Sequence, residues 1–284
     1  MLPNGQFSLR QTREILASLG HSPRKPLGQN FLIDGNIVRK SLQLASIRPG
    51  ETVVEIGPGL GTLTGALLEA GAAVYAVERD RVLAQHLREW LAPQYPGKFF
   101  LTEGDALDYP LANLPAGAVD DFKIVANLPY AISTPWMDAV LEGRLPVEMV
   151  LMLQRETAAR FTAQPGSKTF GAISVALDAT YVRTPGHKVP PVCFFPPPQV
   201  DSCLLHLRRR EHPVRISTQT HRLIRALFLH RRKQLGAIVK HLSPKPPAIE
   251  CWLARLPEWG MDATARPEAV PFAAWHALDA LISA

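Results

Sequence analysis

Apolar segments of two kinds alternate along the first part of the chain. A short continuous apolar run at 52–56 predicts a buried strand, and apolar residues at helical spacing from Leu63 to Ala70 predict a helix directly after it. The alternation continues with strands at 74–77, 99–102, 122–126 and 147–153 and with helices at 81–91, 135–141 and 155–161. Strands that alternate with helices indicate a mostly parallel, doubly wound α/β sheet of the Rossmann-like kind.

The segments on either side of this alternation complete the predicted fold. Further strands are expected at 172–182 and 204–208, and further helices at 9–19, 36–45, 248–253 and 271–282. An apolar stripe from Ile224 to Leu242 predicts one longer helix, which Pro244 ends. We therefore expect two domains: an α/β domain over 1–211, with a helix and a loop in 1–35, and a small helical domain over 212–284.

Three glycines follow the first strand of the predicted sheet. Gly57, Gly59 and Gly61 lie between that strand and its helix, where missing Cβ atoms allow a ligand to approach the backbone closely. A glycine triplet by itself is equally compatible with a packing turn. The next strand, however, ends in Glu78, whose carboxylate is suited to accept hydrogen bonds from both hydroxyls of a ribose. The combination favours a nucleoside cofactor.

Two more polar side chains follow later strands of the sheet. Asp105 comes just after the third strand, where its carboxylate is suited to accept a hydrogen bond from an adenine amino group. Asn127 comes at the end of the fourth strand. Because doubly wound sheets bind ligands at the carboxyl ends of their strands, we expect Glu78, Asp105 and Asn127 at one site. Taken alone, an Asp in such a loop is more often a cap or a turn former.

The residues Asn127, Leu128, Pro129 and Tyr130 suit the transfer of a methyl group from a sulfonium to the exocyclic amine of a base. Such an amine is a poor nucleophile because its lone pair is delocalised into the ring. The Asn127 side-chain oxygen and the Leu128 carbonyl could accept its two N–H groups, while Tyr130 offers a stacking face to a flipped base. Pro129 restricts the turn, and since Asn127 is uncharged, positioning should matter more than a strong base. The alternative is a plain Asn-x-Pro turn.

A proline-rich segment near residue 195 has the pattern F-x-P-x-P-x-V-x-S. It runs from Phe194 to Ser202, and its prolines would hold an aromatic ring rigidly. Phe194 could then close the second face of the target base. The alternative is an edge strand with a buried phenylalanine.

Composition excludes several other classes of protein. The chain has 284 residues, 46 % hydrophobic and 20 % charged, which is typical of a soluble globular protein. No apolar run approaches the roughly 20 residues of a membrane span, and the first residues lack the pattern of a secretory signal. The three cysteines are scattered without a C-x-x-C pair, which favours free thiols in a reducing compartment. We expect a cytoplasmic protein without a metal site.

Positive charge is concentrated in one segment of the chain. Residues 203–245 contain eleven Lys and Arg against the single acid Glu211, so this segment carries +10 while the whole chain carries +6. A charge run is often only a solvated helix face. On a chain with a sequence pI of about 9.4, a concentrated patch also suits a polyanionic partner.

Taken together, these motifs resemble those of the ribosomal RNA adenine dimethyltransferases. The resemblance covers nearly the whole chain and rests on these segments: Leu27–Leu32, Glu55–Gly61, Glu78, Gly104–Asp105, Asn127–Tyr130 and Phe194–Ser202. It implies an enzyme that uses S-adenosylmethionine to place two methyl groups on N6 of adenosine. In that family the residues matching Asn30 and Leu32 border the cofactor, Gly57 lies under its methionine part, and Asn127 reaches between cofactor and target. Gly59, Glu78 and Asp105 complete the expected cofactor site.

Within the family the chain is similar to the small-subunit branch. The segments that carry this similarity are Lys25–Asp34, Leu153–Glu156, Pro165–Lys168 and Arg231–Lys233. The resemblance implies that two adjacent adenosines near the 3′ end of 16S rRNA are methylated in the assembling small ribosomal subunit. We expect a monomer that contacts the RNA through the basic residues Arg222, Arg225, Arg231, Arg232 and Lys233.

Two other functions stay open at this point. One is methylation of an adenosine in 23S rRNA, as in the macrolide-resistance branch of the family. The other is a non-catalytic RNA-binding factor in ribosome assembly, against which Glu78, Asp105 and Asn127 argue. The chain also departs from the family pattern at Ala131, where an Asn is frequent, and at Gly236. We expect Gly236 to weaken either an RNA contact or its own helix, by about 1 kcal/mol relative to Ala.

Overall fold

The computed structural model describes residues 7–117 and 120–283, and its internal contacts divide it into two compact units. The first unit takes the chain up to Ala158 together with Arg183–Arg209, and the second takes Ala159–Val182 together with the chain from Arg210. The boundary near residue 210 lies close to the one expected from the sequence. Residues 159–182 belong to the second unit, whereas the sequence analysis assigned them to the first domain.

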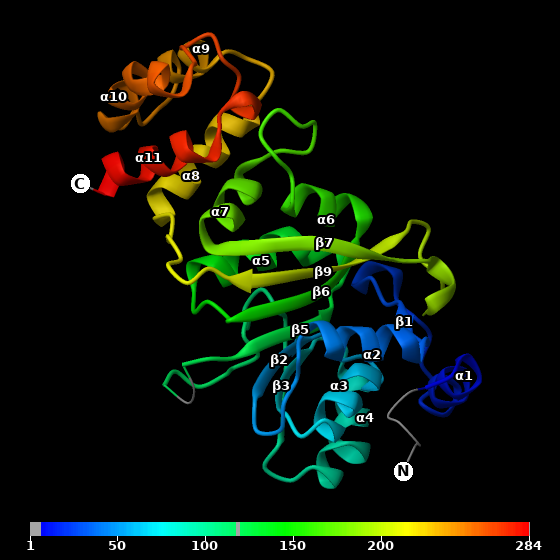
Figure 1. Cartoon of the computed structure of the whole chain (residues 1–284). Helices are drawn as coiled ribbons and strands as arrows, with labels where there is room; N and C mark the ends of the chain where they lie inside the picture. Colours follow the sequence, from blue (N-terminus) through cyan, green and yellow to red (C-terminus); the bar gives the residue numbers. More distant parts are fainter. Residues whose placement is uncertain (1–6, 118–119, 284) are drawn as a thin grey trace. The chain divides into compact units, whose positions relative to one another are not determined.

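A seven-stranded sheet forms the centre of the first unit (Figure 1). Its strands follow the order β4-β3-β2-β5-β6-β9-β7, and their bounds are β2 Thr52–Ile56, β3 Ala73–Glu78, β4 Phe99–Glu103, β5 Lys123–Asn127, β6 Glu148–Gln154, β7 Tyr181–Val189 and β9 Ser202–Arg209. The first five strands of that order pair in parallel, and β9 pairs with β6 in the antiparallel direction. The carboxyl ends of β2, β3, β4 and β5 therefore share one edge.

Helices connect these strands, as the sequence pattern predicts. They are α2 Gly35–Leu44, α3 Thr62–Glu69, α4 Arg81–Trp90, α5 Ser133–Glu142 and α6 Arg155–Phe161, the last of which enters the second unit. The α/β fold is thus confirmed, with strand and helix bounds within one or two residues of those expected for β2, β3, β5, β6 and α2 to α5.

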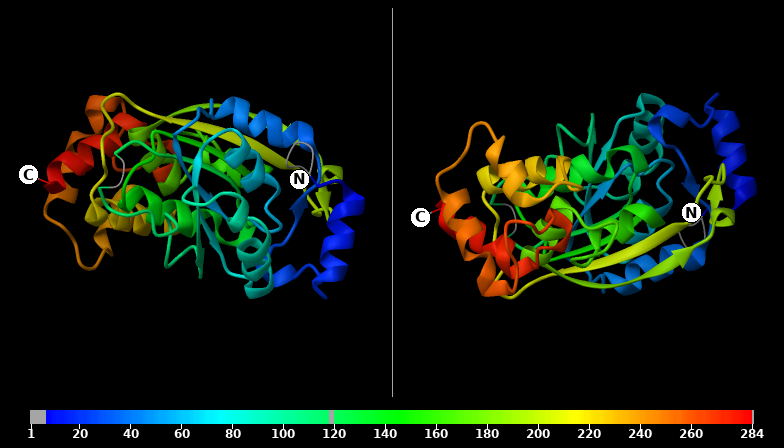
Figure 2. Two further views of the ribbon diagram at one scale, coloured as in Figure 1. Left: turned by 90° about the horizontal axis from the view of Figure 1, so that it is seen from below. Right: turned by 90° about the horizontal axis from the view of Figure 1, so that it is seen from above.

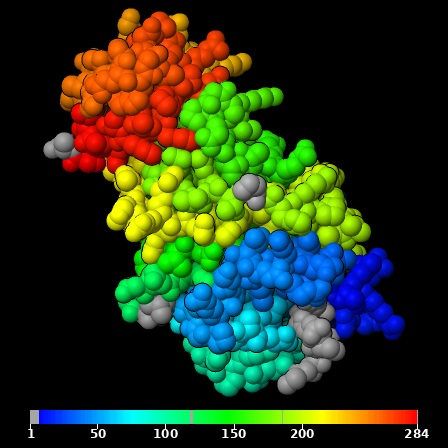
Figure 3. Space-filling model, in the orientation of Figure 1, coloured from blue at the N-terminus to red at the C-terminus, as the bar shows by residue number. Residues whose placement is uncertain are grey.

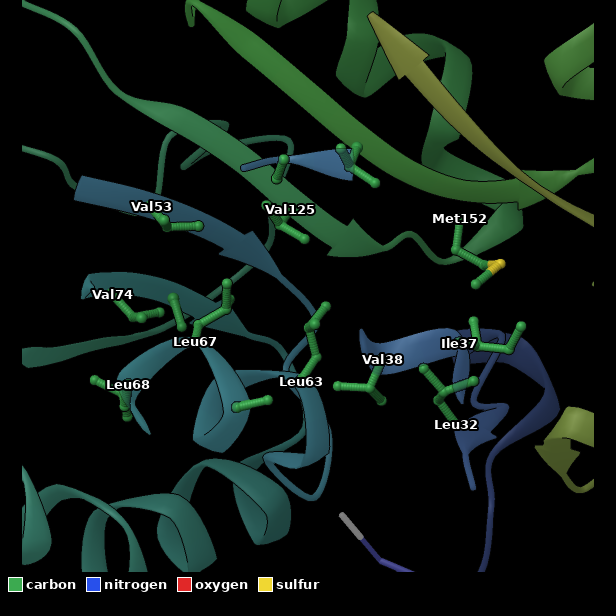
Figure 4. Close-up of a cluster of buried hydrophobic side chains, with 14 of the residues drawn as sticks. Leu32, Ile37, Val38, Val53, Leu63, Leu67, Leu68, Val74, Val125 and Met152 are labelled. Carbon is green, nitrogen blue, oxygen red and sulfur yellow. The ribbon is translucent and has the colours of Figure 1, made fainter. Parts of the chain in front are cut away.

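One face of the sheet packs against α2 and α3 in a continuous hydrophobic core. Figure 4 shows Val53, Val74 and Val125 on the strands facing Leu63 and Leu67 on α3. All five side chains are buried, and Val53, Val74, Val125 and Leu67 are completely so. The removal of such apolar area from water is the main force that holds the sheet and helices together. The core therefore places the glycine loop, which joins β2 to α3, at a rigid position.

The N-terminal segment lies against a part of the chain that is far away in sequence. Helix α1 (Leu9–Ser18) begins with a capping box of Ser8 and Gln11, and β1 (Phe31–Leu32) pairs with β8 (Phe194–Phe195). Both views of Figure 2 show the dark-blue N-terminal residues beside the yellow-green residues near 195. Figure 3 shows the dark-blue residues of this segment at the surface, beside the lighter-blue residues near 40.

One predicted strand is wrong. Residues 172–182 were expected to be a strand, but Ala172–Thr180 form helix α7, and β7 starts only at Tyr181. The Ser174 hydroxyl accepts a hydrogen bond from the Gly171 N–H at the start of this helix. Because α7 is buried on nearly all sides, its sequence is mostly apolar and lacks the periodicity that distinguishes a helix from a strand.

The second unit consists mainly of helices, which are α7, α8 Thr218–Leu229, α9 Leu235–Lys240, α10 Ala248–Arg255 and α11 Phe272–Ser283. The stripe from Ile224 to Leu242, expected as one helix, is broken between α8 and α9. The first N–H groups of α9 do not continue α8. Instead, Leu235 donates to the Ala265 carbonyl and Gly236 donates to the Ala263 carbonyl.

This contact also explains why a glycine stands at position 236. A Cβ at Gly236 would lie 3.2 Å from both the Cβ and the carbonyl oxygen of Ala263, which is tighter than ordinary van der Waals contact. The expectation that Gly236 merely weakens the helix is therefore incomplete, because the missing side chain permits this close approach.

Within the described ranges no helix is both long and apolar enough to cross a membrane.

Candidate active site

A pocket opens in the first unit at the carboxyl ends of β2, β3, β4 and β5. Its wall includes the glycine loop after β2, the residues after β3 and β4, the start of the segment after β5, and the loop that precedes β1. The lining contains all seven cofactor residues expected from the sequence, namely Asn30, Leu32, Gly57, Gly59, Glu78, Asp105 and Asn127. The prediction that these strand ends converge on one site agrees with the structure.

The glycine loop has a backbone conformation that other residues rarely adopt. Gly57, Gly59 and Gly61 have φ values of +66°, +60° and +87°. A Cβ at Gly61 would also lie only 2.8 Å from Leu87 Cδ2 on α4. The loop therefore needs glycine for its own folding and for the approach of α4, in addition to any approach by a ligand.

Glu78 is a buried carboxylate with both oxygens engaged. Its Oε2 accepts a hydrogen bond from the Gly59 N–H at 3.0 Å, and its Oε1 accepts one from the Asp80 N–H at 2.8 Å. Burial raises the pKa of Glu78 to about 6, although these backbone hydrogen bonds oppose the increase. Each carboxylate oxygen has a further lone pair, so Glu78 keeps the capacity to accept two ribose hydroxyls.

A second buried carboxylate, which the sequence analysis did not single out, lines the same pocket. Glu55 is 1 % exposed, and its Oε2 has no hydrogen-bond partner among the described residues. Burial is the main cause that raises the pKa of Glu55 to about 8; the nearby Thr64 hydroxyl opposes the increase, and the charge of Glu78 adds to it. A buried polar atom without a partner is costly in a folded protein, so its presence at a pocket indicates a ligand group or water that satisfies it.

Asp105 lies at the pocket after β4 and forms local contacts. Its Oδ1 accepts a hydrogen bond from the Leu107 N–H at 2.9 Å, and its Oδ2 lies 3.1 Å from the Arg79 guanidinium. Asp105 thus forms the turn that the sequence analysis gave as the alternative, and it also lines the pocket. An adenine amino group would share this carboxylate with Arg79 rather than meet a free one.

Asn127 is held by the loop that precedes β1. Its Nδ2 donates a hydrogen bond to the Asn30 carbonyl at 3.0 Å, and Asn30 Nδ2 in turn donates to the Gly28 carbonyl at 3.1 Å. No described residue donates a hydrogen bond to the other end of this amide, Asn127 Oδ1. The amide is therefore oriented with its NH₂ towards the loop and with its oxygen available as an acceptor.

Pro129 and Tyr130 are fixed by neighbouring segments. Gly28 and Gly57 both have positive φ, and a Cβ on either would lie 3.6 Å from the Pro129 ring, so this ring lies between the two loops. The Tyr130 hydroxyl is hydrogen-bonded to the hydroxyl of Ser202 on β9, and burial raises the Tyr130 pKa. The Leu128 side chain is buried, and its N–H donates to the Met152 carbonyl at 3.2 Å.

Comparison with known proteins agrees with this geometry. A family model described as "Ribosomal RNA adenine dimethylase" matches residues 20–248. The chain belongs to this family. A relative from Opitutus terrae, named "Ribosomal RNA small subunit methyltransferase A", is 59 % identical over 267 residues, which cover 94 % of this chain and 96 % of the relative. A protein of the same name from Magnetococcus marinus is 39 % identical over 91 % of each chain.

Solved structures are similar as well. A dimethyladenosine transferase from Plasmodium falciparum superimposes with a TM-score of 0.70 at 24 % identity, covering 87 % of this chain and 95 % of the other. The 23S rRNA methyltransferase ErmE gives a TM-score of 0.63 at 25 % identity, covering 90 % and 100 %. The family resemblance and the methyltransferase fold expected from the sequence are both confirmed.

Phe194 is placed differently from the expectation for a base-stacking residue. Its ring is 2 % exposed, belongs to the hydrophobic core between the sheet and α2, and does not line the pocket. The alternative, a buried phenylalanine on a short strand, describes its position in this structure. The last residue of the F-x-P-x-P-x-V-x-S segment, Ser202, does contact a candidate site residue, because its hydroxyl is hydrogen-bonded to that of Tyr130.

The sequence analysis did not single out Gln29 or Asp80. The Gln29 Nε2 donates a hydrogen bond to Asp80 Oδ2 at 2.9 Å. Asp80 is 1 % exposed and begins helix α4 by accepting the Val82 N–H. The available signal was an Asp two residues after Glu78, immediately before a helix, which is a typical N-cap.

The basic residues expected to contact RNA lie in the second unit and differ in their surroundings. Arg222, Arg232 and Lys233 are exposed. Arg231 instead forms an ion pair with Glu268, with its Nε and one terminal nitrogen 2.9 and 2.6 Å from the same oxygen. Arg225 is exposed on α8. No group of three or more His, Cys, Asp or Glu residues suited to a metal ion is present in the part of the chain that the structure describes.

The buried Glu55 leads to a prediction about stability and pH. Its pKa is raised from 4.5 to about 8 on folding, so the folded state holds a proton that the unfolded state releases between these pH values. This group therefore destabilises the fold progressively as pH rises from 4.5 to about 8. We expect Glu55→Gln to be more stable than the parent chain at pH 8.5 and to lose that advantage near pH 5, measured as the free energy of unfolding in urea without ligands.

A matched control for this experiment is Glu69→Gln, which removes an exposed carboxylate at the end of α3. This variant should keep the pH profile of the parent chain. If Glu55→Gln and the parent differed equally at both pH values, the assignment of a buried, protonated Glu55 would be wrong.

Proposed function

We propose that this chain transfers methyl groups from S-adenosylmethionine to N6 of two adjacent adenosines near the 3′ end of 16S rRNA, in the assembling small ribosomal subunit. The observation that carries the proposal is the oriented amide of Asn127 at the rim of the pocket that contains Glu78. The names of the relatives from Opitutus terrae and Magnetococcus marinus support the small subunit as the substrate.

The pocket suits the proposed cofactor by its charge and its hydrogen-bonding groups. The lining contains three carboxylates, Glu55, Glu78 and Asp105, against one basic side chain, Arg79. Such a lining suits a ligand with a sulfonium and an ammonium cation. Glu78 would hold the ribose, Asp105 the adenine amino group, and Gly57 would lie under the methionine part. The unpaired oxygen of Glu55 is available for a further donor group of the cofactor.

Bound S-adenosylmethionine supplies an electrophilic methyl group on a positively charged sulfur. The chain's own contribution is to orient the adenosine and to exclude water. Asn127 Oδ1 would accept one N–H of the N6 amine, and the Leu128 carbonyl would accept the other, which draws the nitrogen lone pair out of the ring. Tyr130, held by Ser202, would stack on the flipped base. Since Asn127 cannot take up a proton at neutral pH, the rate depends mainly on geometry.

A second candidate function is methylation of 23S rRNA. The similarity to ErmE over 90 % of this chain favours it. The 59 % identity to a small-subunit methyltransferase weighs more, because it covers nearly the whole of both chains. A non-catalytic RNA-binding factor is less well supported, since the pocket retains Glu78, Asp105 and Asn127 together. We further propose that the protein acts as a cytoplasmic monomer.

The first test is the choice of substrate. Labelled S-adenosylmethionine should transfer its methyl groups to undermethylated small subunits but not to large subunits, and the label should be recovered as N6,N6-dimethyladenosine. Naked 16S and 23S rRNA are assayed in parallel. Label on 23S rRNA would replace the proposal by its second candidate, and label on no RNA, with the cofactor still bound, would favour the non-catalytic factor.

Asn127→Ala tests the proposed catalytic residue. Loss of the acceptor oxygen should nearly abolish methyl transfer to small subunits, while the cofactor Kd, measured by calorimetry, changes little. The matched control is Asn36→Ala, which removes an exposed amide on α2 and should leave the rate unchanged. A normal rate in Asn127→Ala would exclude the role given to this residue.

Arg232 and Arg231 provide a paired test of the RNA contact. Arg232 is exposed, so Arg232→Ala should weaken binding to small subunits and reduce the slope of log K against log salt by about one, without loss of stability. Arg231→Ala should instead lower the free energy of unfolding, because it leaves Glu268 without its ion-pair partner. Equal salt slopes for Arg232→Ala and the parent chain would contradict the proposed contact.

A further inference from the structure

The Gln29 side chain connects the loop before β1 to the start of helix α4. Its Oε1 accepts a hydrogen bond from the Arg24 N–H at 2.7 Å and lies 3.1 Å from His21 Nε2. Its Nε2 donates to Asp80 Oδ2 at 2.9 Å. Only one N–H of this amide is thus left without a partner in the hydrogen bonds described. Gln29 also lines the pocket.

Asp80 joins this loop to the carboxylate proposed to hold the ribose. Its side chain is fully buried, with Oδ1 accepting the Val82 N–H at 3.0 Å and Oδ2 accepting Gln29. Its own N–H donates to Glu78 Oε1 at 2.8 Å. The Arg24 guanidinium lies 3.3 Å and His21 Nε2 lies 3.6 Å from the same Oδ2, so the buried charge of Asp80 is surrounded by donors from the loop.

The residue after Gln29 holds the catalytic amide. The Asn30 carbonyl accepts the hydrogen bond from Asn127 Nδ2, and this contact decides which end of the amide faces the target base. An amide turned by 180° would present NH₂ to the N6 amine, and two donors would then oppose each other. A shift of the Asn30 backbone would therefore disturb the acceptor even though Asn127 itself is unchanged.

From these contacts we propose that Gln29 is a positioning residue for methyl transfer, which fixes the Asn30 carbonyl and thereby keeps Asn127 Oδ1 directed at the target amine. The chain of contacts runs from Glu78 through Asp80 and Gln29 to Asn30 and Asn127. It joins the cofactor site to the target site through the loop that borders both. The inference rests on the role proposed above for Asn127.

Gln29→Met tests this inference because methionine has a similar length and no hydrogen-bonding amide. We expect the single-turnover rate of methyl transfer, at saturating S-adenosylmethionine and small subunits, to fall about 10-fold or more, since misplacement by 1 Å can cost about 100-fold. The cofactor Kd should change far less than the rate. Gln43→Met, at an exposed position of α2, is the matched control and should behave like the parent chain.

A purely structural role for Gln29 would produce a different pattern. If Gln29 acts through Asn127, Gln29→Met should lower the rate of the parent chain but not the residual rate of Asn127→Ala. If it merely stabilises the loop, both rates should fall by the same factor, and the inference is overturned. An unchanged rate in Gln29→Met overturns it as well.

Side-chain amide signals provide a readout that does not depend on activity. The NH₂ resonances of Asn127 in ¹⁵N-labelled protein are identified by their loss in Asn127→Ala. They should shift in Gln29→Met and stay in place in Gln43→Met. Identical Asn127 resonances in Gln29→Met and the parent chain would show that the Asn30 contact does not need Gln29, and would overturn the inference even where the residual rate of Asn127→Ala is too low to measure.

Asp80→Asn breaks the same contact from the other side. Asn is as good an N-cap as Asp, so the start of α4 should persist, but an NH₂ in place of Oδ2 would oppose Gln29 Nε2. We expect the same loss of rate and the same Asn127 shift as in Gln29→Met, and a normal rate would count against the inference. If Asn127→Ala is itself fully active, the proposed function of Asn127 fails. If only the Gln29 and Asp80 variants are active, the positioning role alone fails.

Discussion

The hydrogen bonds that hold the buried Glu78 carboxylate are the constraint on which the rest of the site depends. One oxygen accepts the N–H of Gly59 in the loop after β2, and the other accepts the N–H of Asp80 at the start of α4. A carboxylate without such donors would be too costly to bury in its charged form. The end of β3 therefore determines where the glycine loop and α4 lie, and through Gln29 it also determines where the loop before β1 lies.

The buried acids of this pocket lower the stability of the fold, and they provide groups that can bind a ligand. Glu55 and Glu78 share one wall, and burial raises the pKa of both, to about 8 and about 6. In the absence of a ligand they weaken the fold at neutral pH, because carboxylates that are ionised in the unfolded chain must take up a proton or lose their hydration when they are buried. A cationic ligand would offset this cost, since it supplies an opposite charge. The same residues would thus favour the positively charged cofactor proposed above.

The sheet, and the pocket at its strand ends, could be predicted from the sequence because strand ends and glycine turns are local signals. The contacts between distant segments had no such signal. Nothing near Gln29 indicates that it meets Asp80, and Arg231 looks no different from Arg232 although only Arg231 is paired with Glu268. The strand expected at 172–182 failed for a related reason. A helix that is buried on all sides loses the periodicity that reveals it, so its identity depends on the tertiary structure around it.

The groups proposed to act on the target amine are neutral, and this places a particular demand on the fold. A charged base could be effective over a range of distances, whereas an amide oxygen and a carbonyl must lie within hydrogen-bonding reach of the amine. The structure meets this demand by locking the segment after β5 from three sides. The Pro129 ring lies between two glycines with positive φ, Ser202 holds Tyr130, and the Asn30 carbonyl holds Asn127. Any dependence of the reaction on pH should then arise from the acids proposed to hold the cofactor, because the side chains proposed to orient the base do not titrate near neutrality.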